Sequence, residues 1–142
     1  SSMPRCSRLC RTNRPKGNIM LTRILCVAAG GALGSVSRYL VVVWMSRHVV
    51  SAFPFWTLGI NISGSFLIGF AARIFYHGFP GHEFYWLFAV VGFLGGFSTF
   101  SAFSFETVEL IKNGNIIYAI LNIAVSISLC FGIIYFFTRS NA

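Results

Sequence analysis

Glycines and hydroxyl side chains occupy the middle of one long apolar stretch, and they are the first candidates for chemistry. From Val91 to Ser104 the sequence reads VGFLGGFSTFSAFS. Because glycine and hydroxyl residues are poor helix formers, the segment predicts either close helix packing through Gly92 and Gly96 or a helix break at 95–98. A break inside a membrane requires backbone that is buried or lines a cavity. Its freed carbonyls could hold a cation and its freed amides an anion, although composition alone favours packing.

Two phenylalanines beside these hydroxyls could also attract an anion. Phe100 and Phe103 are three residues apart and share one helix face. An aromatic ring carries partial positive charge at its edge, and neighbouring hydroxyls could donate hydrogen bonds to the same ion. These hydroxyls belong to Ser98, Thr99, Ser101 and Ser104. Since the chain contains 16 phenylalanines, packing in the core or against lipid is the default interpretation.

Uncharged polar residues and one arginine lie in the other apolar stretches. Asn61 needs a hydrogen-bond partner if it is surrounded by lipid, either in a helix contact or as a donor in a pore. Tyr118, Asn122 and Ser126 recur every four residues and form one polar stripe on a helix. The stripe suits a water-lined path and an interhelical contact equally well. Arg38 could reach the membrane interface or supply positive potential to an anion vestibule.

The elements that must position these residues are four apolar runs of about 18–22 residues. A helix of about 20 residues crosses a bilayer core, so the sequence predicts an all-α membrane protein with four transmembrane helices. The expected helices cover about 22–46, 55–76, 84–108 and 115–138. The composition agrees, with 56% hydrophobic and 10% charged residues in 142 and a mean hydropathy of +0.74. These values exclude a soluble enzyme and a disordered chain.

The charge is concentrated at the start of the chain. The net charge is +8, and five of the eleven basic residues lie within the first 16 positions. We therefore expect a basic leader over residues 1–19, disordered or not native, followed by a four-helix transmembrane domain over residues 20–142. The alternative is that the leader is a basic arm that lies on the membrane face. No nucleic-acid partner is expected. The remaining basic residues divide almost evenly between the two sides, with Arg23, Arg73 and Arg139 facing Arg47 and Lys112.

Several function classes lack their residues in this sequence. The three acids are Glu83, Glu106 and Glu109, all at or beyond the ends of apolar runs. No nucleophile and base are paired within a run, so we do not expect an enzyme. A proton-coupled exporter usually needs a carboxylate inside the membrane. The four cysteines have no zinc spacing and are interpreted as structural.

Taken together, three segments closely resemble the Fluc (CrcB) family of fluoride channels, and the resemblance runs from about residue 20 to residue 139. The matching motifs are Gly30-Gly31-x-x-Gly34-x-x-x-Arg38-Tyr39, Thr57-Leu58-x-x-Asn61-x-x-Gly64-Ser65-Phe66-Leu67-Ile68-Gly69 and Gly92-Phe93-x-Gly95-Gly96-Phe97-Ser98-Thr99-Phe100-Ser101-x-Phe103-Ser104-x-Glu106. The resemblance implies a four-helix subunit whose third helix is broken near its middle. It also implies an antiparallel, dual-topology homodimer with two fluoride pores in the inner (plasma) membrane.

The resemblance further assigns roles to single residues. It implies that a structural sodium ion at the dimer centre is held by the backbone carbonyls of Gly95 and Ser98. The pore residues that it implies are Asn61, Phe100 and Phe103, with Ser101, Thr99, Tyr118, Asn122, Ser126 and Arg38 beside them, while Glu106 matches another charged position near the pore. The chain departs from the family pattern at Ser98 and Ala102, where threonine is usual, and at Asn122, where serine is frequent.

The sequence therefore predicts a passive channel that exports cytoplasmic fluoride and gives fluoride resistance. A small dual-topology exporter of cationic drugs is one alternative. The other is a membrane assembly subunit that transports nothing, in which the glycines and Asn61 serve packing alone. Substitution of Asn61 or Phe100 is expected to distinguish the channel from the assembly subunit, because loss of a packing residue changes stability and loss of a pore residue changes ion flux.

Overall fold

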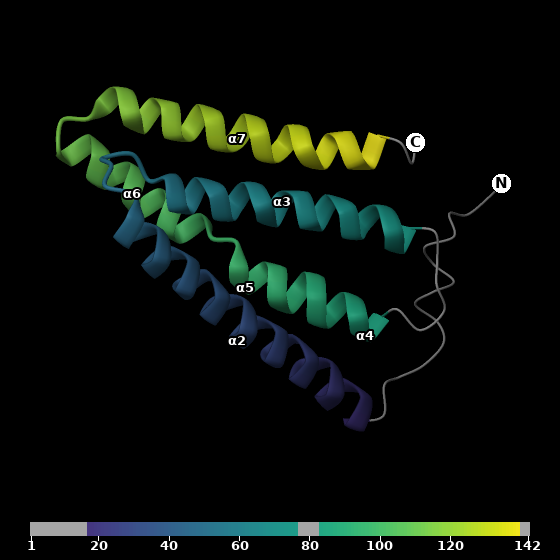
Figure 1. Ribbon diagram of the computed structural model, residues 1–142. Coiled ribbons are helices and arrows are strands. Elements are labelled where there is room, and N and C mark those ends of the chain that lie inside the picture. Colours follow the sequence, from purple (N-terminus) through teal and green to yellow (C-terminus); the bar gives the residue numbers. More distant parts are fainter. Residues whose placement is uncertain (1–16, 77–82, 140–142) are drawn as a thin grey trace.

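The computed structural model describes residues 17–76 and 83–139, and within these ranges it consists of helices without a strand (Figure 1). The basic residues of the expected leader, together with Cys6 and Cys10, lie outside the described residues. The elements in chain order are α2 (Gly17–His48), α3 (Phe55–Tyr76), α4 (Glu83–Trp86), the π-helix η1 (Leu87–Leu94), α5 (Gly95–Phe97), α6 (Phe100–Lys112) and α7 (Ile116–Arg139).

Four segments are long and apolar enough to cross a membrane, as the sequence predicts. They are Gly17–His48, Phe55–Ile74, Glu83–Lys112 and Ile116–Arg139. The first helix begins earlier than expected, so residues 17–19 of the predicted leader are helical. The third segment continues to Lys112, four residues beyond the expected end at 108. The chain is therefore a multi-pass membrane protein.

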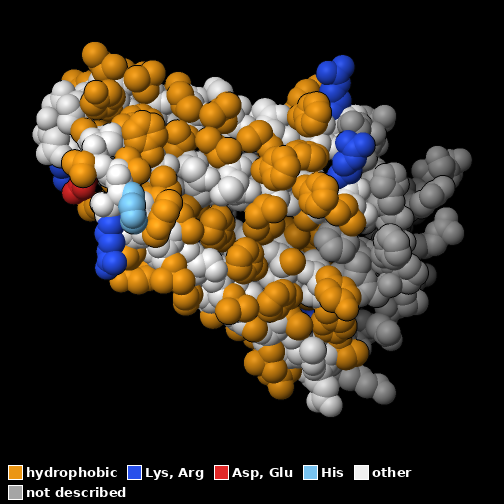
Figure 2. All heavy atoms as spheres, viewed as in Figure 1, with side chains coloured by type: hydrophobic (Ala, Val, Ile, Leu, Met, Phe, Trp, Pro, Cys, Tyr) orange, Lys and Arg blue, Asp and Glu red, His pale blue; other side chains and the backbone are white. Residues whose placement is uncertain are grey.

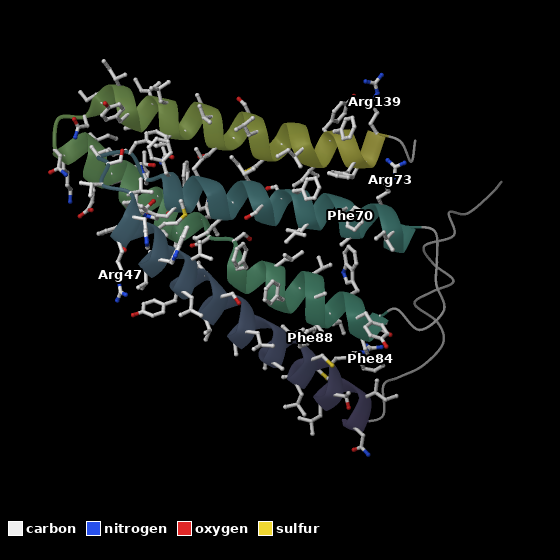
Figure 3. All side chains as sticks on the ribbon, viewed as in Figure 1. Arg47, Phe70, Arg73, Phe84, Phe88 and Arg139 are labelled. Atoms are coloured by element: carbon white, nitrogen blue, oxygen red, sulfur yellow. The ribbon has the colours of Figure 1, made fainter. Side chains whose placement is uncertain are left out.

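The surface of the subunit is largely apolar, and its buried core is small. In Figure 2 hydrophobic side chains cover most of the visible face, while Lys and Arg side chains gather at the two ends. Arg73 and Arg139 lie at one end of the bundle, and Arg47 lies at the opposite end (Figure 3). This distribution is typical of a protein whose sides face lipid and whose ends face water.

Close backbone contacts hold α2 against the third segment. A Cβ atom added to Gly96 would lie 2.6 Å from the carbonyl oxygen of Gly31, and one added to Gly92 would lie 2.9 Å from that of Val27. A Cβ atom at Gly34 would overlap the carbonyl oxygen of Phe93. Small residues permit such an approach between membrane helices. The packing role predicted for Gly92 and Gly96 is thus confirmed by the contacts that these two glycines make.

The other half of the subunit is formed by α3 and α7, which run side by side (Figure 1). Gly69 of α3 leaves room for Phe137 of α7, and the Phe137 ring meets the Phe66 ring edge-on at 5.1 Å between centroids. Between α6 and α7 the chain reverses at Gly114, whose φ of 79° favours glycine. This turn places α6 beside α7 and brings the hydroxyls of the third segment toward the fourth.

Candidate functional site

The third segment leaves the helical conformation at two consecutive residues. Ser98 has φ −75° and ψ 151°, and Thr99 has φ −147° and ψ 122°, so both are extended. A new helix, α6, starts at Phe100, where the Thr99 hydroxyl caps it by accepting a hydrogen bond from the Ala102 amide at 3.3 Å. Threonine is a good capping residue and a poor helix former, so the local sequence supports both features.

Asn61 of α3 occupies this interruption with both ends of its amide. Its Oδ1 accepts from the Thr99 backbone N–H at 2.9 Å, and its Nδ2 donates to the Thr99 carbonyl at 3.0 Å. In a continuous helix the Thr99 N–H would donate to the Gly95 carbonyl. The helical ladder instead ends with Ser98, whose N–H donates to the Leu94 carbonyl at 3.0 Å. The side chain of Asn61 therefore replaces Gly95 as the partner of Thr99.

A cavity of about 260 Å³ opens beside the interruption. Its walls combine hydroxyl, amide and aromatic groups with a smaller number of aliphatic ones, and no charged residue of the described ranges lines it. The lining residues are Asn61, Ser65, Ser98, Thr99, Phe100, Phe103, Ser126, Ile127, Cys130 and Phe131. Such a site can donate hydrogen bonds to a small ion without a fixed counter-charge.

The structure thus brings together six residues that the sequence singled out, from α3, from the third membrane segment and from α7. Phe100 and Phe103 are neighbours, with ring centroids 5.7 Å apart and planes tilted by 42°. Their environments differ, because Phe103 is only 8% exposed whereas Phe100 is 78% exposed in the single subunit. Phe103 is a fixed part of the wall, and Phe100 lies at its open side.

The polar stripe of α7 divides into residues with separate environments. Ser126 lines the cavity, whereas Asn122 has no exposed surface and lies outside the cavity lining. Its Nδ2 donates to the Thr107 hydroxyl of α6 at 2.9 Å. Tyr118 is 44% exposed and packs edge-on against Phe53, with centroids 6.2 Å apart. The four-residue spacing placed these residues on one face but could not show their depth.

Other predicted site residues do not line the cavity. The Ser101 hydroxyl is 3.2 Å from the Thr99 hydroxyl, so it adjoins the α6 cap. Arg38 is half-buried on α2 and Gly95 is exposed at the start of α5. None of these three belongs to the cavity lining.

Glu106 joins α6 to the start of α3. Its Oε1 accepts from the Trp56 indole N–H at 2.9 Å and from the Thr57 hydroxyl at 2.8 Å. Because both donors lie in the first turn of α3, the carboxylate is at the positive end of a helix dipole. Its Oε2 is buried and has no hydrogen-bond partner within the described chain. The carboxylate therefore joins the middle of α6 to the first turn of α3, about one helical turn beyond the cavity residue Phe103.

Sequence reasoning missed several residues of this site, and some of them carried a usable signal. Cys130 continues the stripe of Tyr118, Asn122 and Ser126 at the same four-residue spacing, and it lines the cavity. Ser65 is one helical turn after Asn61 and also lines the cavity. Thr107, which is buried behind the cavity, follows Phe103 by four residues and so carried the same signal.

Metal ligation by side chains finds no support among residues 17–76 and 83–139. No group of three His, Cys, Asp or Glu residues lies together there. At the interruption, the Gly95 carbonyl is one that the Thr99 amide has left.

Comparison with known proteins identifies close relatives. The family model described as "CrcB-like protein, Camphor Resistance (CrcB)" matches residues 25–137. A protein of Rhizobium meliloti (strain 1021), named "Fluoride-specific ion channel FluC", is 44% identical over 109 residues, which cover 77% of this chain and 87% of the relative. Proteins with the same name are 45% identical in Elusimicrobium minutum (strain Pei191), covering 78% of this chain and 86% of the relative, and 41% identical in Idiomarina loihiensis, covering 83% and 91%.

Proposed function

Because this chain belongs to the CrcB-like family, we propose that it is a passive ion channel selective for fluoride, which it exports from the cell. Its relatives bear the name of a fluoride-specific channel and not of an enzyme. The observation that carries the proposal is the cavity of about 260 Å³ beside the Ser98–Thr99 interruption, where hydroxyl, amide and aromatic groups meet inside a membrane-spanning bundle.

The cavity offers what a small, strongly hydrated anion needs to leave water. Each water molecule lost must be replaced by a donor of similar strength, yet binding must stay weak enough for release. One of the two N–H groups of Asn61 is used by Thr99, and the second is available to the cavity that this residue lines. The hydroxyl of Ser65 and the ring edges of Phe100 and Phe103 would supply further partial positive charge, and the Ser126 hydroxyl would do so after it turns away from Asn122.

A lining without charged residues favours passage of the ion over tight binding. Arg38, Glu106 and the other described charged residues do not line this cavity. A fixed cation in a region of low dielectric constant would hold an anion strongly. Neutral donors arranged along a path bind more weakly, so that an ion can pass from one donor to the next. Larger halides would be excluded because the same donors could not close around them.

We also propose that two subunits assemble antiparallel around a structural sodium ion. The residues fit such an ion, because the Gly95 carbonyl has lost its helical donor and Gly95 is exposed on the subunit. The Ser98 carbonyl belongs to the adjacent extended backbone. Bound there, sodium would supply positive charge that neutralises converging carbonyl dipoles. The nearly balanced charges at the two ends of the bundle support insertion in both orientations.

The two alternative functions have weaker support. A proton-coupled exporter needs a carboxylate in the transport path, and no acidic residue of the described ranges lines the cavity. An assembly subunit without transport is favoured by one observation, namely that Asn61 bonds twice to the Thr99 backbone as a packing residue would. The hydroxyl and amide groups in the mainly apolar cavity beside that contact are better explained by a channel.

Ion efflux from liposomes tests the proposal directly. The purified protein is reconstituted into vesicles loaded with either fluoride or chloride, and release is followed with ion-selective electrodes after the membrane potential is collapsed. We expect fast fluoride efflux and chloride efflux at the rate of protein-free vesicles. Vesicles with verified, folded protein that release neither ion would refute the channel.

A further inference from the structure

A chain of three hydrogen bonds connects two walls of the cavity through residues that lie behind it. The Ser126 hydroxyl donates to Asn122 Oδ1 at 3.4 Å, Asn122 Nδ2 donates to Thr107 Oγ1 at 2.9 Å, and the Thr107 hydroxyl donates to the Phe103 carbonyl at 2.7 Å. Ser126 and Phe103 line the cavity, whereas Asn122 and Thr107 do not. The chain therefore links α7 to α6 next to the proposed ion path.

The direction of this chain follows from its chemistry. Thr107 has one hydroxyl hydrogen, and it is used by the Phe103 carbonyl. Thr107 can then only accept from Asn122, so the amide nitrogen of Asn122 must face Thr107. The amide oxygen consequently faces Ser126. A carbonyl oxygen can only accept, and this fixes the hydrogen of Ser126 on the side of Asn122, away from the cavity.

The bonds at the two ends of Asn122 differ in strength. The contact with Thr107 has an ordinary length, whereas 3.4 Å is long for a hydroxyl donor, whose usual range ends near 3.0 Å. Asn122 has no exposed surface, so loss of Thr107 would leave a buried N–H group unpaired. Asn122 is thus held firmly by α6 and holds Ser126 only weakly.

We propose that Asn122 is a positioning residue for fluoride that never contacts the ion. It keeps the hydroxyl hydrogen of Ser126 turned away from the cavity until an anion arrives. Rotation about the Cβ–Oγ bond then moves this hydrogen from the neutral amide to the anion, because an ionised acceptor forms the stronger hydrogen bond. The inference rests on the proposed function. It adds to it a hydrogen-bond donor, the Ser126 hydroxyl, whose orientation is set by Asn122 outside the cavity lining.

The test compares fluoride affinities at equilibrium in the purified full-length protein. The dissociation constant is obtained from the rise of Tm with fluoride, in mixtures with chloride of constant ionic strength. Asn122→Leu removes the competing acceptor, so we expect the constant for fluoride to fall about two- to threefold, which corresponds to about 0.5 kcal/mol for a weak hydrogen bond. In a Ser126→Ala background the same substitution should leave the constant unchanged.

A second variant acts at the other end of the amide. Thr107→Val removes the acceptor that orients Asn122, so the amide can turn its nitrogen to Ser126 and release the hydroxyl hydrogen. We expect the same direction of change, again only when Ser126 is present. This variant decides the question alone if Asn122→Leu does not fold. Ser128→Ala is the matched control, because it deletes an exposed hydroxyl of α7 outside this cavity and should leave the constant unchanged.

The outcomes separate this inference from the proposed function. Wild-type protein without fluoride efflux would remove the channel itself. If the wild type conducts fluoride, the role of Asn122 is refuted by an unchanged constant in the folded variants, or by an equal change in the Ser126→Ala background. Conduction without any fluoride-dependent rise in Tm refutes it as well.

Discussion

At the scale of single residues, Asn61 connects the fold and the proposed ion path. Its amide forms hydrogen bonds with the backbone N–H and C=O of Thr99, and the same side chain lines the cavity. Truncation would therefore change stability and flux together, which cannot distinguish a packing residue from a pore residue. A substitution that keeps the shape and changes the charge is more informative.

Asn61→Asp is such a substitution. Its Oδ1 still accepts from the Thr99 amide, while the Thr99 carbonyl loses its donor at a cost of about 1–3 kcal/mol. The new negative charge lies in a cavity of low dielectric constant and repels an anion. We expect fluoride efflux from liposomes to fall at least tenfold in protein that remains folded.

The control for this charge is Asn115→Asp, which lies before the first turn of α7 and outside the cavity lining. An acidic residue there is compatible with the helix dipole, so efflux should stay near the wild-type rate. Equal efflux from both variants would contradict the placement of Asn61 in the ion path.

At the scale of elements, α2 and the third segment are joined by close backbone contacts at their glycines and by the ion pair of Arg23 with Glu83, whose atoms are 2.7 Å apart. The π-helix η1 lies against α2 where Gly30 and Gly92 meet, and α5 continues the contact through Gly96. A π-helix shifts the helical register and is frequent at functional sites. Here it precedes the interruption at Ser98, and the glycine contacts fix where that interruption lies.

Gly96→Ala tests this contact, because the added methyl group would lie 2.6 Å from the Gly31 carbonyl oxygen. Backbone cannot move aside as a flexible side chain can, so we expect a loss of about 1–3 kcal/mol in stability. The measurement is thermal unfolding in detergent, followed by tryptophan fluorescence. Gly59→Ala is the control, since nothing lies within 4 Å of its added methyl group and its Tm should be unchanged or higher. Equal Tm values for the two variants would show that the contact is not tight.

The sequence predicted the elements better than the depth of the residues on them. Hydropathy located four spans because a lipid-facing helix is apolar on most sides. The motif around Ser98 and Phe103 identified four of the ten residues that line the cavity. The four-residue spacing of Tyr118, Asn122 and Ser126 predicted one face, yet the depth of each residue depends on how α6 crosses α7. That crossing is set by tertiary contacts such as the one with Thr107, which a pattern along one helix does not contain.

At the scale of the whole molecule, the two ends of the bundle carry similar numbers of basic residues. Arg73 and Arg139 at one end face Arg47 at the other (Figure 3). Orientation in a membrane follows the difference in basic charge between the two sides. The described residues differ little between the two ends and give little preference for either orientation, whereas the five basic residues within the first 16 positions add charge on the N-terminal side.

We therefore expect both orientations in cells for a chain without residues 1–16. In that chain, which also lacks Cys6 and Cys10, Asn113→Cys provides an exposed thiol between α6 and α7. A membrane-impermeant maleimide should label about half of the chains from outside and the rest only after permeabilisation, as weak charge bias requires. Labelling of nearly all chains from one side alone would contradict a dual-topology assembly.

The backbone contact of Gly31 with Gly96 also has a mechanical consequence. Side chains that interdigitate can change rotamer and let two helices slide by small steps, but the atoms nearest to Gly96 are backbone atoms of Gly31 and the short hydroxyl of Ser35. We therefore expect α2 and α5 to move together. Any breathing that widens the cavity for a passing ion has to come from the opposite side, where α7 is attached to α6 through hydrogen bonds that can lengthen and exchange.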